Sequence, residues 1–391
     1  MPRKRGKRLS QIIFSTVGFL TLLFTACGGD GNGGGGGKVP SAWEQVSVAA
    51  GLNHTCAIAQ GKSLWCWGSA AFGKLGIGPG DESRTTPCQV GTDTDWLSVS
   101  AAGDKTYALK NDGGVWFWGK DVPEKLAGTN SDIPVHIFAG TTFAQIEAGE
   151  AHNCGLKSDG SLWCWGLNLY GQIGDNTDTA KVLPTQVNPG TSWSAFAVGA
   201  DFTCGVQTDG SLRCWGNNQF GQLGDGSNDN RWVPTQLGGF GSYDQWVSVF
   251  AGFHQACGIR TDGGLSCWGF NEGGELGDGT TADKNVPTAI AEPVTIAGVT
   301  WKIVSGWYNQ TYGIKSNGSL FCWGWCETSQ SWEKTLSGVG TDAWAAIDAR
   351  AKHVCGIKTD GSLWCWGENS AGQVGDGTSQ NTRSAPVLVG G

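Results

Sequence analysis

The residues of this chain with the clearest capacity for chemistry are its 14 cysteines. Ten of them form five pairs with one common spacing: Cys56 and Cys66, Cys154 and Cys164, Cys204 and Cys214, Cys257 and Cys267, and Cys355 and Cys365. This spacing differs from that of zinc-binding hairpins, and no histidine recurs regularly enough beside it to complete a metal site. We predict a disulfide bond within each pair, and therefore an oxidising compartment, in preference to ten buried thiols.

Four cysteines lie outside these pairs: Cys27, Cys88, Cys322 and Cys326. A bond between Cys322 and Cys326 needs a tight bend after Gly324. If Cys27 is modified, as argued below, at least one of the other thiols then stays free or pairs outside the chain.

Three histidines stand two positions before the first cysteine of a pair, at His54, His152 and His353. A position that repeats by rotation could place its imidazoles in a ring around a central channel. Other copies carry Lys105, Phe202 and Gln255 there, however, and such an interrupted ring is a poor metal site. The favoured interpretation is that these histidines satisfy backbone groups between repeats.

Acidic loops and aromatic residues offer two further candidate sites. The segments 175–178, 225–229 and 278–280 resemble calcium loops in composition, but none has glycine at the sixth and glutamate at the twelfth position, so turn formation explains them better. Phe72, Tyr170 and Phe220 each follow a Trp-Gly glycine by four residues. They are candidates for a partner-binding surface, although their fixed register favours packing between repeats.

Motifs for catalysis are missing from the sequence. It contains no nucleophile elbow, zinc-protease motif, phosphate loop or dinucleotide fingerprint, so we predict no catalytic residue, no cofactor and no metal. The formal net charge of −8 argues against nucleic acid, whose binding depends on Lys and Arg that neutralise phosphates. Scattered carboxylates in a central channel remain a possible active site that no motif would disclose.

The cysteines are positioned by a hairpin that recurs along the chain. In the copy at 152–166, two short apolar runs flank Asp159-Gly160, and glycine supplies the positive φ that a tight turn needs. The turn lies between the two cysteines, so their side chains can oppose each other on one face. Trp163 and Trp165 then point to the other face, and a strand with two apolar faces must be covered on both sides.

Seven Trp-Gly dipeptides, at Trp67, Trp118, Trp165, Trp215, Trp268, Trp323 and Trp366, indicate seven repeats. Each repeat also has an upstream segment with an aromatic residue and a downstream segment that often begins Pro-Thr-Gln, as at Pro184 and Pro234. This pattern predicts an all-β chain with about four strands per repeat. No repeat could bury both faces alone, so neighbours must stack.

These repeats resemble those of the regulator of chromosome condensation family. The resemblance rests on Cys-Gly-Leu-Lys-Ser-Asp-Gly-Ser-Leu-Trp-Cys-Trp-Gly and Gly-Gln-Leu-Gly-Asp-Gly, in the form found in bacterial members, and covers nearly all of residues 41–391. It implies a seven-bladed β-propeller. We expect the N- and C-terminal strands, near Trp43 and at 386–389, to close the ring by sharing one blade.

Two repeats depart from the pattern. The second has Tyr107 and Phe117 in place of both cysteines and lacks the Gly-Gln-Leu-Gly segment, whereas the sixth has Tyr312 and an unusual segment at 324–327. Irregular units of a ring often carry binding loops, although drift without functional consequence is an equally good explanation.

The N-terminal residues are typical of an exported protein. Residues 1–26 combine a basic start with an apolar run, as in an export leader, and the residues before Cys27 resemble a bacterial lipoprotein signal, with Phe24 where leucine is usual. We predict that Cys27 is lipidated, that 27–40 form a glycine-rich tether and that 41–391 form the propeller. Gly28 follows this cysteine and does not resemble the Asp that retains many bacterial lipoproteins at the inner membrane, so by analogy we expect a location at the outer membrane or cell surface.

The predicted function is that of a cell-envelope lipoprotein whose propeller binds a protein or glycan without catalysis. We expect an unknown protein or glycan partner, membrane contact only through the lipid, no nucleic acid, and a monomer. The alternatives are a hydrolase or lyase that acts on envelope polysaccharide and a purely structural surface protein. In the family that these repeats resemble, eukaryotic members act on a small GTPase in the nucleus, and another member is an inhibitor protein that binds over a beta-lactamase. Neither role can be carried over to this sequence residue by residue.

Overall fold

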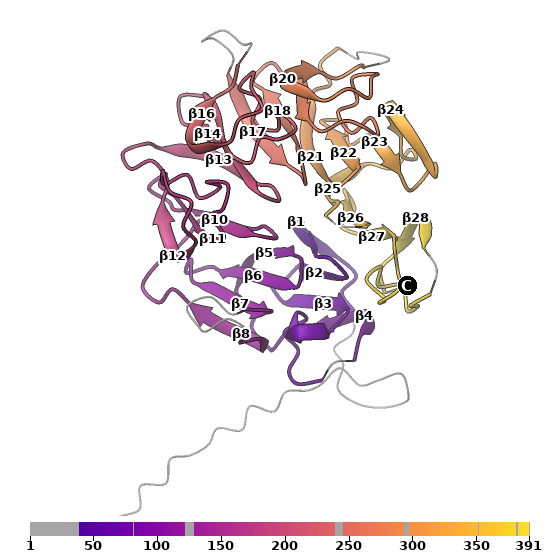
Figure 1. Ribbon diagram of the computed structural model, residues 1–391. Helices are drawn as coiled ribbons and strands as arrows, with labels where there is room; N and C mark the ends of the chain where they lie inside the picture. The colour runs from indigo at the N-terminus through magenta and orange to yellow at the C-terminus, as the bar shows by residue number, and fades with distance from the viewer. Residues whose placement is uncertain are drawn as a thin grey trace, which may run out of the picture.

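The computed structural model describes residues 39–80, 82–121, 129–238, 245–292, 297–350, 352–380 and 382–390. The expected leader, Cys27 and most of the tether lie outside these residues. The described residues form 28 strands and one short 3-10 helix, η1 (Ala71–Gly73), and the strands make seven antiparallel sheets of four. The sheets stand as blades around a common centre, with the first strand of each blade innermost (Figure 1). The predicted all-β, seven-bladed propeller is therefore confirmed.

Each blade is built from four consecutive strands. Blade one contains β1 (Trp43–Ala50), β2 (His54–Ala59), β3 (Leu64–Gly68) and β4 (Arg84–Gln89), and blade two contains β5 (Trp96–Ala102), β6 (Lys105–Lys110), β7 (Val115–Gly119) and β8 (Ser131–Ile137). Blade three contains β9 (Gln145–Ala148), β10 (His152–Leu156), β11 (Leu162–Gly166) and β12 (Lys181–Gln186), and blade four contains β13 (Trp193–Val198), β14 (Phe202–Gln207), β15 (Leu212–Gly216) and β16 (Arg231–Gln236).

The remaining blades follow the same order. Blade five contains β17 (Trp246–Ala251), β18 (Gln255–Arg260), β19 (Leu265–Gly269) and β20 (Lys284–Ala289), and blade six contains β21 (Trp301–Trp307), β22 (Gln310–Lys315), β23 (Leu320–Cys326) and β24 (Ser331–Gly338). Blade seven contains β25 (Trp344–Asp348), β26 (His353–Lys358), β27 (Leu363–Gly367) and β28 (Arg383–Leu388). Within the described residues there is no helix long and apolar enough to cross a bilayer.

The hairpin at the centre of each blade has the predicted register. In blade three, Cys154 lies opposite Cys164, and Leu156 lies opposite Leu162. Gly160 takes a φ of 81°, and the Asp159 carboxylate accepts a hydrogen bond from the Ser161 amide at 2.8 Å. The turn therefore fixes which residues oppose each other, and this register brings the cysteine side chains together.

Six disulfide bonds join described cysteines. Five are the predicted cross-strand pairs: Cys56 with Cys66, Cys154 with Cys164, Cys204 with Cys214, Cys257 with Cys267, and Cys355 with Cys365. The sixth joins Cys322 to Cys326 in blade six. Cys88 is buried and is also disulfide-bonded, so none of the described cysteines is a free thiol. Of the two expected outcomes, a free thiol or a bond outside the chain, the first does not occur among the described residues.

The core consists of clusters between neighbouring blades, and tryptophans fill most of them. Between blades three and four, Trp193 and Trp215 are buried with their ring centroids 5.6 Å apart. The Trp193 ring lies over Gly205, where a Cβ atom would stand 2.7 Å from it. In four of the five disulfide-bonded hairpins a glycine follows the first cysteine and makes room for the aromatic residue of the adjacent strand, whereas blade one has Ala57 at this position.

The ring closes differently from our expectation. The C-terminal strand β28 pairs with β27 of its own blade, and β1 pairs with β2, so no blade among the described residues combines strands from both ends of the chain. The prediction of a shared blade was wrong. The fourth strand of each blade pairs with the hairpin of its own blade, so no strand is left to complete a blade at the other end of the chain. Blades one and seven instead meet face to face, where Trp43, Trp67 and Val389 lie in one buried cluster.

The tryptophans of the Trp-Gly dipeptides also bind the preceding blade. The Trp215 indole donates to the Gln172 carbonyl at 3.0 Å, and Trp67 and Trp268 make equivalent bonds to Gln373 and Gln222. In these three cases the acceptor belongs to a Gly-Gln-Ile-Gly, Gly-Gln-Leu-Gly or Gly-Gln-Val-Gly segment. The loop that follows the third strand of a blade therefore attaches that blade to the next blade of the ring.

Blades two and six lack this segment, and a tyrosine replaces it. The Tyr107 hydroxyl accepts a hydrogen bond from the Trp165 indole at 3.3 Å, and Tyr312 accepts one from Trp366 at the same distance. Both tyrosines occupy the position of the first cysteine in the other hairpins. The loss of a cross-strand disulfide in these blades therefore has a structural reason, since the tyrosine supplies the missing acceptor.

Candidate functional site

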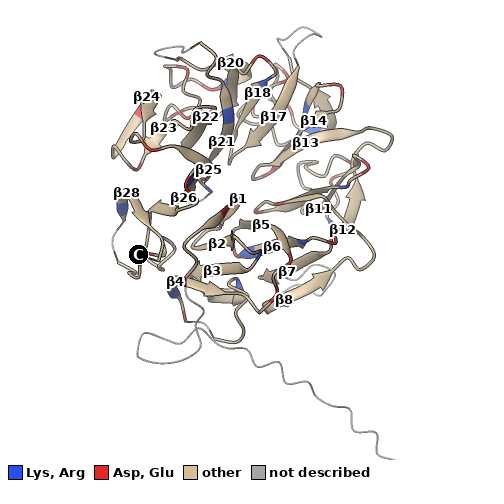
Figure 2. Ribbon diagram, turned by 180° about the vertical axis from the view of Figure 1, so that it is seen from behind, with Lys and Arg blue, Asp and Glu red and all other residues tan. Residues whose placement is uncertain are grey.

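The centre of the ring is closed by a buried ion pair. Arg350, just after β25, donates to the Ala148 carbonyl at 2.7 Å and pairs with the Glu147 carboxylate of blade three, on the far side of the axis. Asp348 accepts from the Ala50 amide of blade one at 2.8 Å and from the Ser305 hydroxyl of blade six at 3.2 Å. Figure 2 shows acidic and basic positions together beside β25.

A small cavity lies beside Arg350 at this centre. It has a volume of about 10 Å³ and is lined by Ala50, Leu52, Ala102, Gly103, Glu150, Trp307 and Arg350. Burial raises the pKa of both Glu147 and Asp348, although the charge of Arg350 opposes the shift. A substrate that needed carboxylates in a central channel would have to displace this network.

Replacing Arg350 by methionine should destabilise the fold by about 3–5 kcal/mol, because the substitution leaves two buried carboxylates without their cation. Urea unfolding followed by tryptophan fluorescence measures the loss. The double variant Arg350→Met with Glu147→Gln should recover part of it, since one uncompensated carboxylate is then neutral. A loss below about 1 kcal/mol for the single variant would contradict this role for the ion pair.

The three repeated histidines join neighbouring blades. The Nε2 atom of His152 lies 2.7 Å from the Thr203 hydroxyl of blade four, and that hydroxyl donates to the Gln172 carbonyl at 2.8 Å. His54 contacts Thr106 in the same way at 2.9 Å, and His353 contacts Thr55 at 2.7 Å. Because the threonine donates its proton to a carbonyl, Nε2 of the histidine must be the donor to the threonine.

Burial keeps these histidines neutral. Desolvation lowers the pKa of His152 to about 3, assisted by the nearby charge of Lys105, and lowers that of His353 to about 3. Desolvation also lowers the pKa of His54 well below its usual value, with further contributions from Lys74 and His353. The side chains lie between blades rather than around a channel, which agrees with the favoured structural interpretation.

The acidic loops are organised by side chains of the protein itself. The Asp175 carboxylate accepts from the Thr177 amide and hydroxyl and pairs with Lys181 at 2.7 Å. Asp225, Asp278 and Asp376 are arranged in the same way with Arg231, Lys284 and Arg383. Each carboxylate thus has a cation of the protein beside it, and no cluster of three or more metal-ligating side chains occurs in the described part of the chain.

A cavity with a volume of about 680 Å³ lies between blades six and seven. We call it the blade-six pocket. One wall is the β21–β22 turn, with Trp307, Tyr308, Asn309 and Gln310; a second is the β23–β24 hairpin, with Trp325, Glu327 and Trp332; blade seven supplies Lys352, Glu368, Asn369, Ser370 and Thr382. Four of the twelve lining residues are aromatic and eight are polar or charged. Aromatic surface combined with convergent polar groups is common in small-ligand sites.

The pocket exists because the sixth repeat lacks its long loop. Blade three passes from β11, ending at Gly166, to β12, beginning at Lys181, through a loop that packs on blade four. In blade six, β23 and β24 instead form a hairpin, in which Trp325 lies opposite Trp332 with ring centroids 5.3 Å apart. The space beside blade seven that the loop would cover is therefore open.

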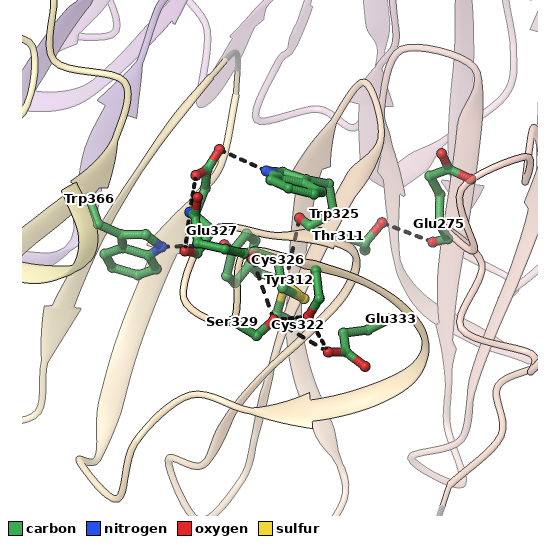
Figure 3. The surroundings of a disulfide bond; sticks show 12 residues. Glu275, Thr311, Tyr312, Cys322, Trp325, Cys326, Glu327, Ser329, Glu333 and Trp366 are labelled. Carbon is green, nitrogen blue, oxygen red and sulfur yellow. Dashed lines mark hydrogen bonds between the residues drawn. A yellow bond between two sulfur atoms is a disulfide. The ribbon is translucent and has the colours of Figure 1, made fainter. Parts of the chain in front are cut away.

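The hairpin is held by the Cys322–Cys326 disulfide and by a carboxylate (Figure 3). The Trp325 indole donates to Glu327 at 3.1 Å, and the Gln330 amide donates to the other carboxylate oxygen at 3.1 Å. On the opposite side of the hairpin, the Ser331 hydroxyl donates to Glu333 at 2.7 Å. These contacts fix the aromatic walls before any ligand arrives.

The sequence-predicted aromatic residues lie outside this pocket, on loops of other blades. Phe72 is 43% exposed, with the Lys120 ammonium 5.3 Å from its ring. Phe220 is half-buried against His254 and Phe270, at 4.8 Å and 5.2 Å, and Tyr170 is also half-buried. Packing between repeats thus accounts for Phe220, and the structure does not bring the three residues together.

Tyr308 and Trp332 were missed as candidates. Tyr308 is 38% exposed, and its ring stacks on Phe253 at 4.4 Å. Trp332 is 50% exposed and lies against Gly273 of blade five, where any Cβ atom would collide with its ring. The signal that could have found Trp332 was the irregular sixth repeat, in which two tryptophans replace the glycine-rich loop.

Comparison with known proteins identifies the repeats. A family model described as the RCC1-like domain matches residues 36–305, and two models of the regulator of chromosome condensation (RCC1) repeat match 346–373 and 360–391. The chain belongs to the RCC1-like domain family. The seven blades and their Trp-Gly hairpins are thus those of a known propeller family.

Relatives in this family are distant. The ultraviolet-B receptor UVR8 of Arabidopsis thaliana is 27% identical over 297 residues, which cover 72% of this chain and 66% of the receptor. The X-linked retinitis pigmentosa GTPase regulator homolog of Caenorhabditis elegans is 35% identical over 101 residues, 24% of this chain and only 7% of that protein. Their activities as whole proteins therefore do not transfer directly.

Solved structures of the RCC1-like propeller agree in fold. Prp20p from Saccharomyces cerevisiae, characterised for its binding properties to Gsp1p and histones, superposes with a TM-score of 0.73 at 17% identity, over 89% of this chain and 87% of that one. Human WBSCR16 gives a TM-score of 0.71 at 20% identity, over 80% of this chain and 87% of that one. At such identities the likeness establishes the architecture alone.

Proposed function

We propose that this protein is an exported, lipid-anchored propeller that binds a protein or glycan of the cell envelope through the blade-six pocket and performs no catalysis. The observation that carries the proposal is the pocket itself, which combines four aromatic with eight polar or charged residues, has a volume of about 680 Å³ and lies on the irregular blade. A propeller that served only as bulk would gain nothing from half-exposed tryptophan and tyrosine side chains at this place.

Family membership supports a binding role. Prp20p, which shares the fold, is described by its binding to Gsp1p and histones. The ion pair of Arg350 with Glu147 supports the absence of catalysis, because it occupies the centre of the ring, where an active site for polysaccharide would gather its carboxylates. Several buried disulfides also suit an oxidising, extracytoplasmic environment.

The lipid anchor and the outer-membrane or cell-surface location rest on the N-terminal sequence. The residues before Cys27 resemble a lipoprotein signal, and the following glycines supply a flexible spacer. A body held near a surface in this way meets its partner at high effective concentration, so modest affinity at the pocket suffices.

Intact-mass analysis of the exported protein tests the anchor. The proposal expects a chain that begins at Cys27 and carries lipid mass, and reduction with alkylation should then label the twelve cysteines of the six described bonds but not Cys27. A mass without lipid, or with residues 1–26 still present, would contradict it.

Retention of an envelope partner tests the binding role. The immobilised mature protein should retain a component that the Trp332→Ala variant loses and that the Trp232→Ala variant keeps. Trp232 is a matched control, since it is 41% exposed and lies on β16, on a different blade from the pocket. The proposal would be contradicted if the wild type and both variants retained the component equally, or if the wild type retained none. It would also be contradicted if the protein shortened envelope polysaccharide.

A further inference from the structure

The chemistry of the blade-six pocket restricts what can bind there. Three of its aromatic side chains present ring surface towards the solvent side, since Tyr308 and Trp332 are 38% and 50% exposed and Trp325 is half-buried. Next to these rings are two carboxylates, Glu327 and Glu368, and one ammonium group, Lys352. The occupant must therefore combine flat apolar faces with many hydrogen-bonding groups.

The charged groups of the pocket already have hydrogen-bond or ionic partners within the protein. Glu327 accepts from Trp325 and Gln330, and Glu368 accepts from Ser370 at 2.9 Å with the Lys352 ammonium 3.9 Å away. The Lys352 ammonium lies beside Glu368 and would repel a cationic ligand at that end of the pocket.

A neutral polyhydroxylated ring satisfies these conditions. Its C–H faces pack on the aromatic surfaces of Trp332 and Tyr308, and its hydroxyl groups both donate to the spare lone pairs of the carboxylates and accept from Lys352. From this geometry, and resting on the proposed function, we infer that the blade-six pocket is a carbohydrate-binding site for a neutral saccharide. Its volume falls within the range of about 300–1,000 Å³ that is usual for small-ligand sites.

The backbone at Tyr308 supports a binding role for this side chain. Tyr308 is the first residue of the two-residue turn between Trp307 and Gln310 and has a φ of 44°. The equivalent residue in blade two, between Ala102 and Lys105, is Gly103, with a φ of 55°. A backbone in the left-handed region favours glycine. Tyr308 therefore occupies a position where the backbone alone favours glycine, which supports a role for its side chain.

Isothermal titration calorimetry on the mature protein tests the inference, with cellotetraose, maltotetraose and the N-acetylglucosamine tetramer as probes, followed by an array of neutral glycans. At least one saccharide should bind with a Kd of about 1 mM or tighter, and Trp332→Ala should weaken it by about tenfold or more. Trp232→Ala should leave the Kd within about a factor of two. Tyr308→Gly is the second variant, because it relaxes the turn and should remove binding without lowering Tm.

Three results would overturn the inference: no heat with any saccharide, equal binding by the wild type and Trp332→Ala, or Trp332-dependent binding of tetramethylammonium or hexalysine in place of a saccharide. These failures are separable from failure of the proposed function. If an envelope partner is still retained in a Trp332-dependent manner, the pocket binds a protein and only the carbohydrate inference is wrong. If nothing is retained either, both are wrong.

Discussion

Reduced and alkylated protein is expected to fail to refold at 25 °C. Each of the five cross-strand bonds joins cysteines 10 residues apart, and a loop of this size contributes about 3 kcal/mol in the chain-entropy model. Five such bonds together reach the whole net stability of an ordinary domain, which is about 5–15 kcal/mol. The measurement is tryptophan fluorescence and near-ultraviolet circular dichroism after reduction and alkylation in urea and removal of the urea.

Removal of single bonds should show that the effect is distributed. Replacing Cys154 and Cys164 together by alanine should cost about 3 kcal/mol, whereas replacing Cys322 and Cys326 should cost about 2 kcal/mol, because the second bond spans only 4 residues. Protein that is alkylated in urea without prior reduction is the control and should refold. A reduced chain that regains the native spectrum would show that blade packing alone is sufficient.

The hairpins and their disulfides could be predicted from sequence because they are local. Asp159-Gly160 fixes a turn, the turn fixes the register, and the register places Cys154 opposite Cys164. The interaction that accompanies cysteine loss could not be predicted in this way. Tyr107 lies far from Trp165 in sequence, and only the stacked blades show that its hydroxyl replaces a loop carbonyl.

The closure of the ring and the pocket depend on contacts between distant segments. A strand that follows a long loop could pair with its own hairpin or with the next blade, and the sequence of β28 does not distinguish the two. The pocket collects side chains from 307–310, 325–332 and 352–382, so its members share no spacing. Its indirect sign was the departure of the sixth repeat from the pattern.

Acidification from pH 7 to pH 5 should destabilise the protein through its interblade histidines. The pKa of His152 and of His353 is lowered from 6.5 to about 3 on folding, so between these values the unfolded chain binds protons that the folded chain does not. Stability is therefore complete above pH 6.5 and is lost as the pH falls towards 3. Each histidine should contribute a loss of about 2 kcal/mol by pH 5.

The double variant His152→Gln with His353→Gln isolates this effect. The chain itself carries glutamine at the equivalent position in blades five and six, as Gln255 and Gln310, so the replacement suits the fold and does not titrate. Glu275 acts in the opposite direction, because burial raises its pKa to about 7 and its contribution is lost as the pH rises, but it is common to both proteins and cancels in the comparison. Urea unfolding at each pH should show a difference of about 4 kcal/mol between wild type and variant in the loss from pH 7 to pH 5. If the free energy of unfolding depended on pH in the same way for both proteins, the buried imidazoles would be protonated without cost. The hydrogen bond from Nε2 to threonine would then not hold the blades together as described.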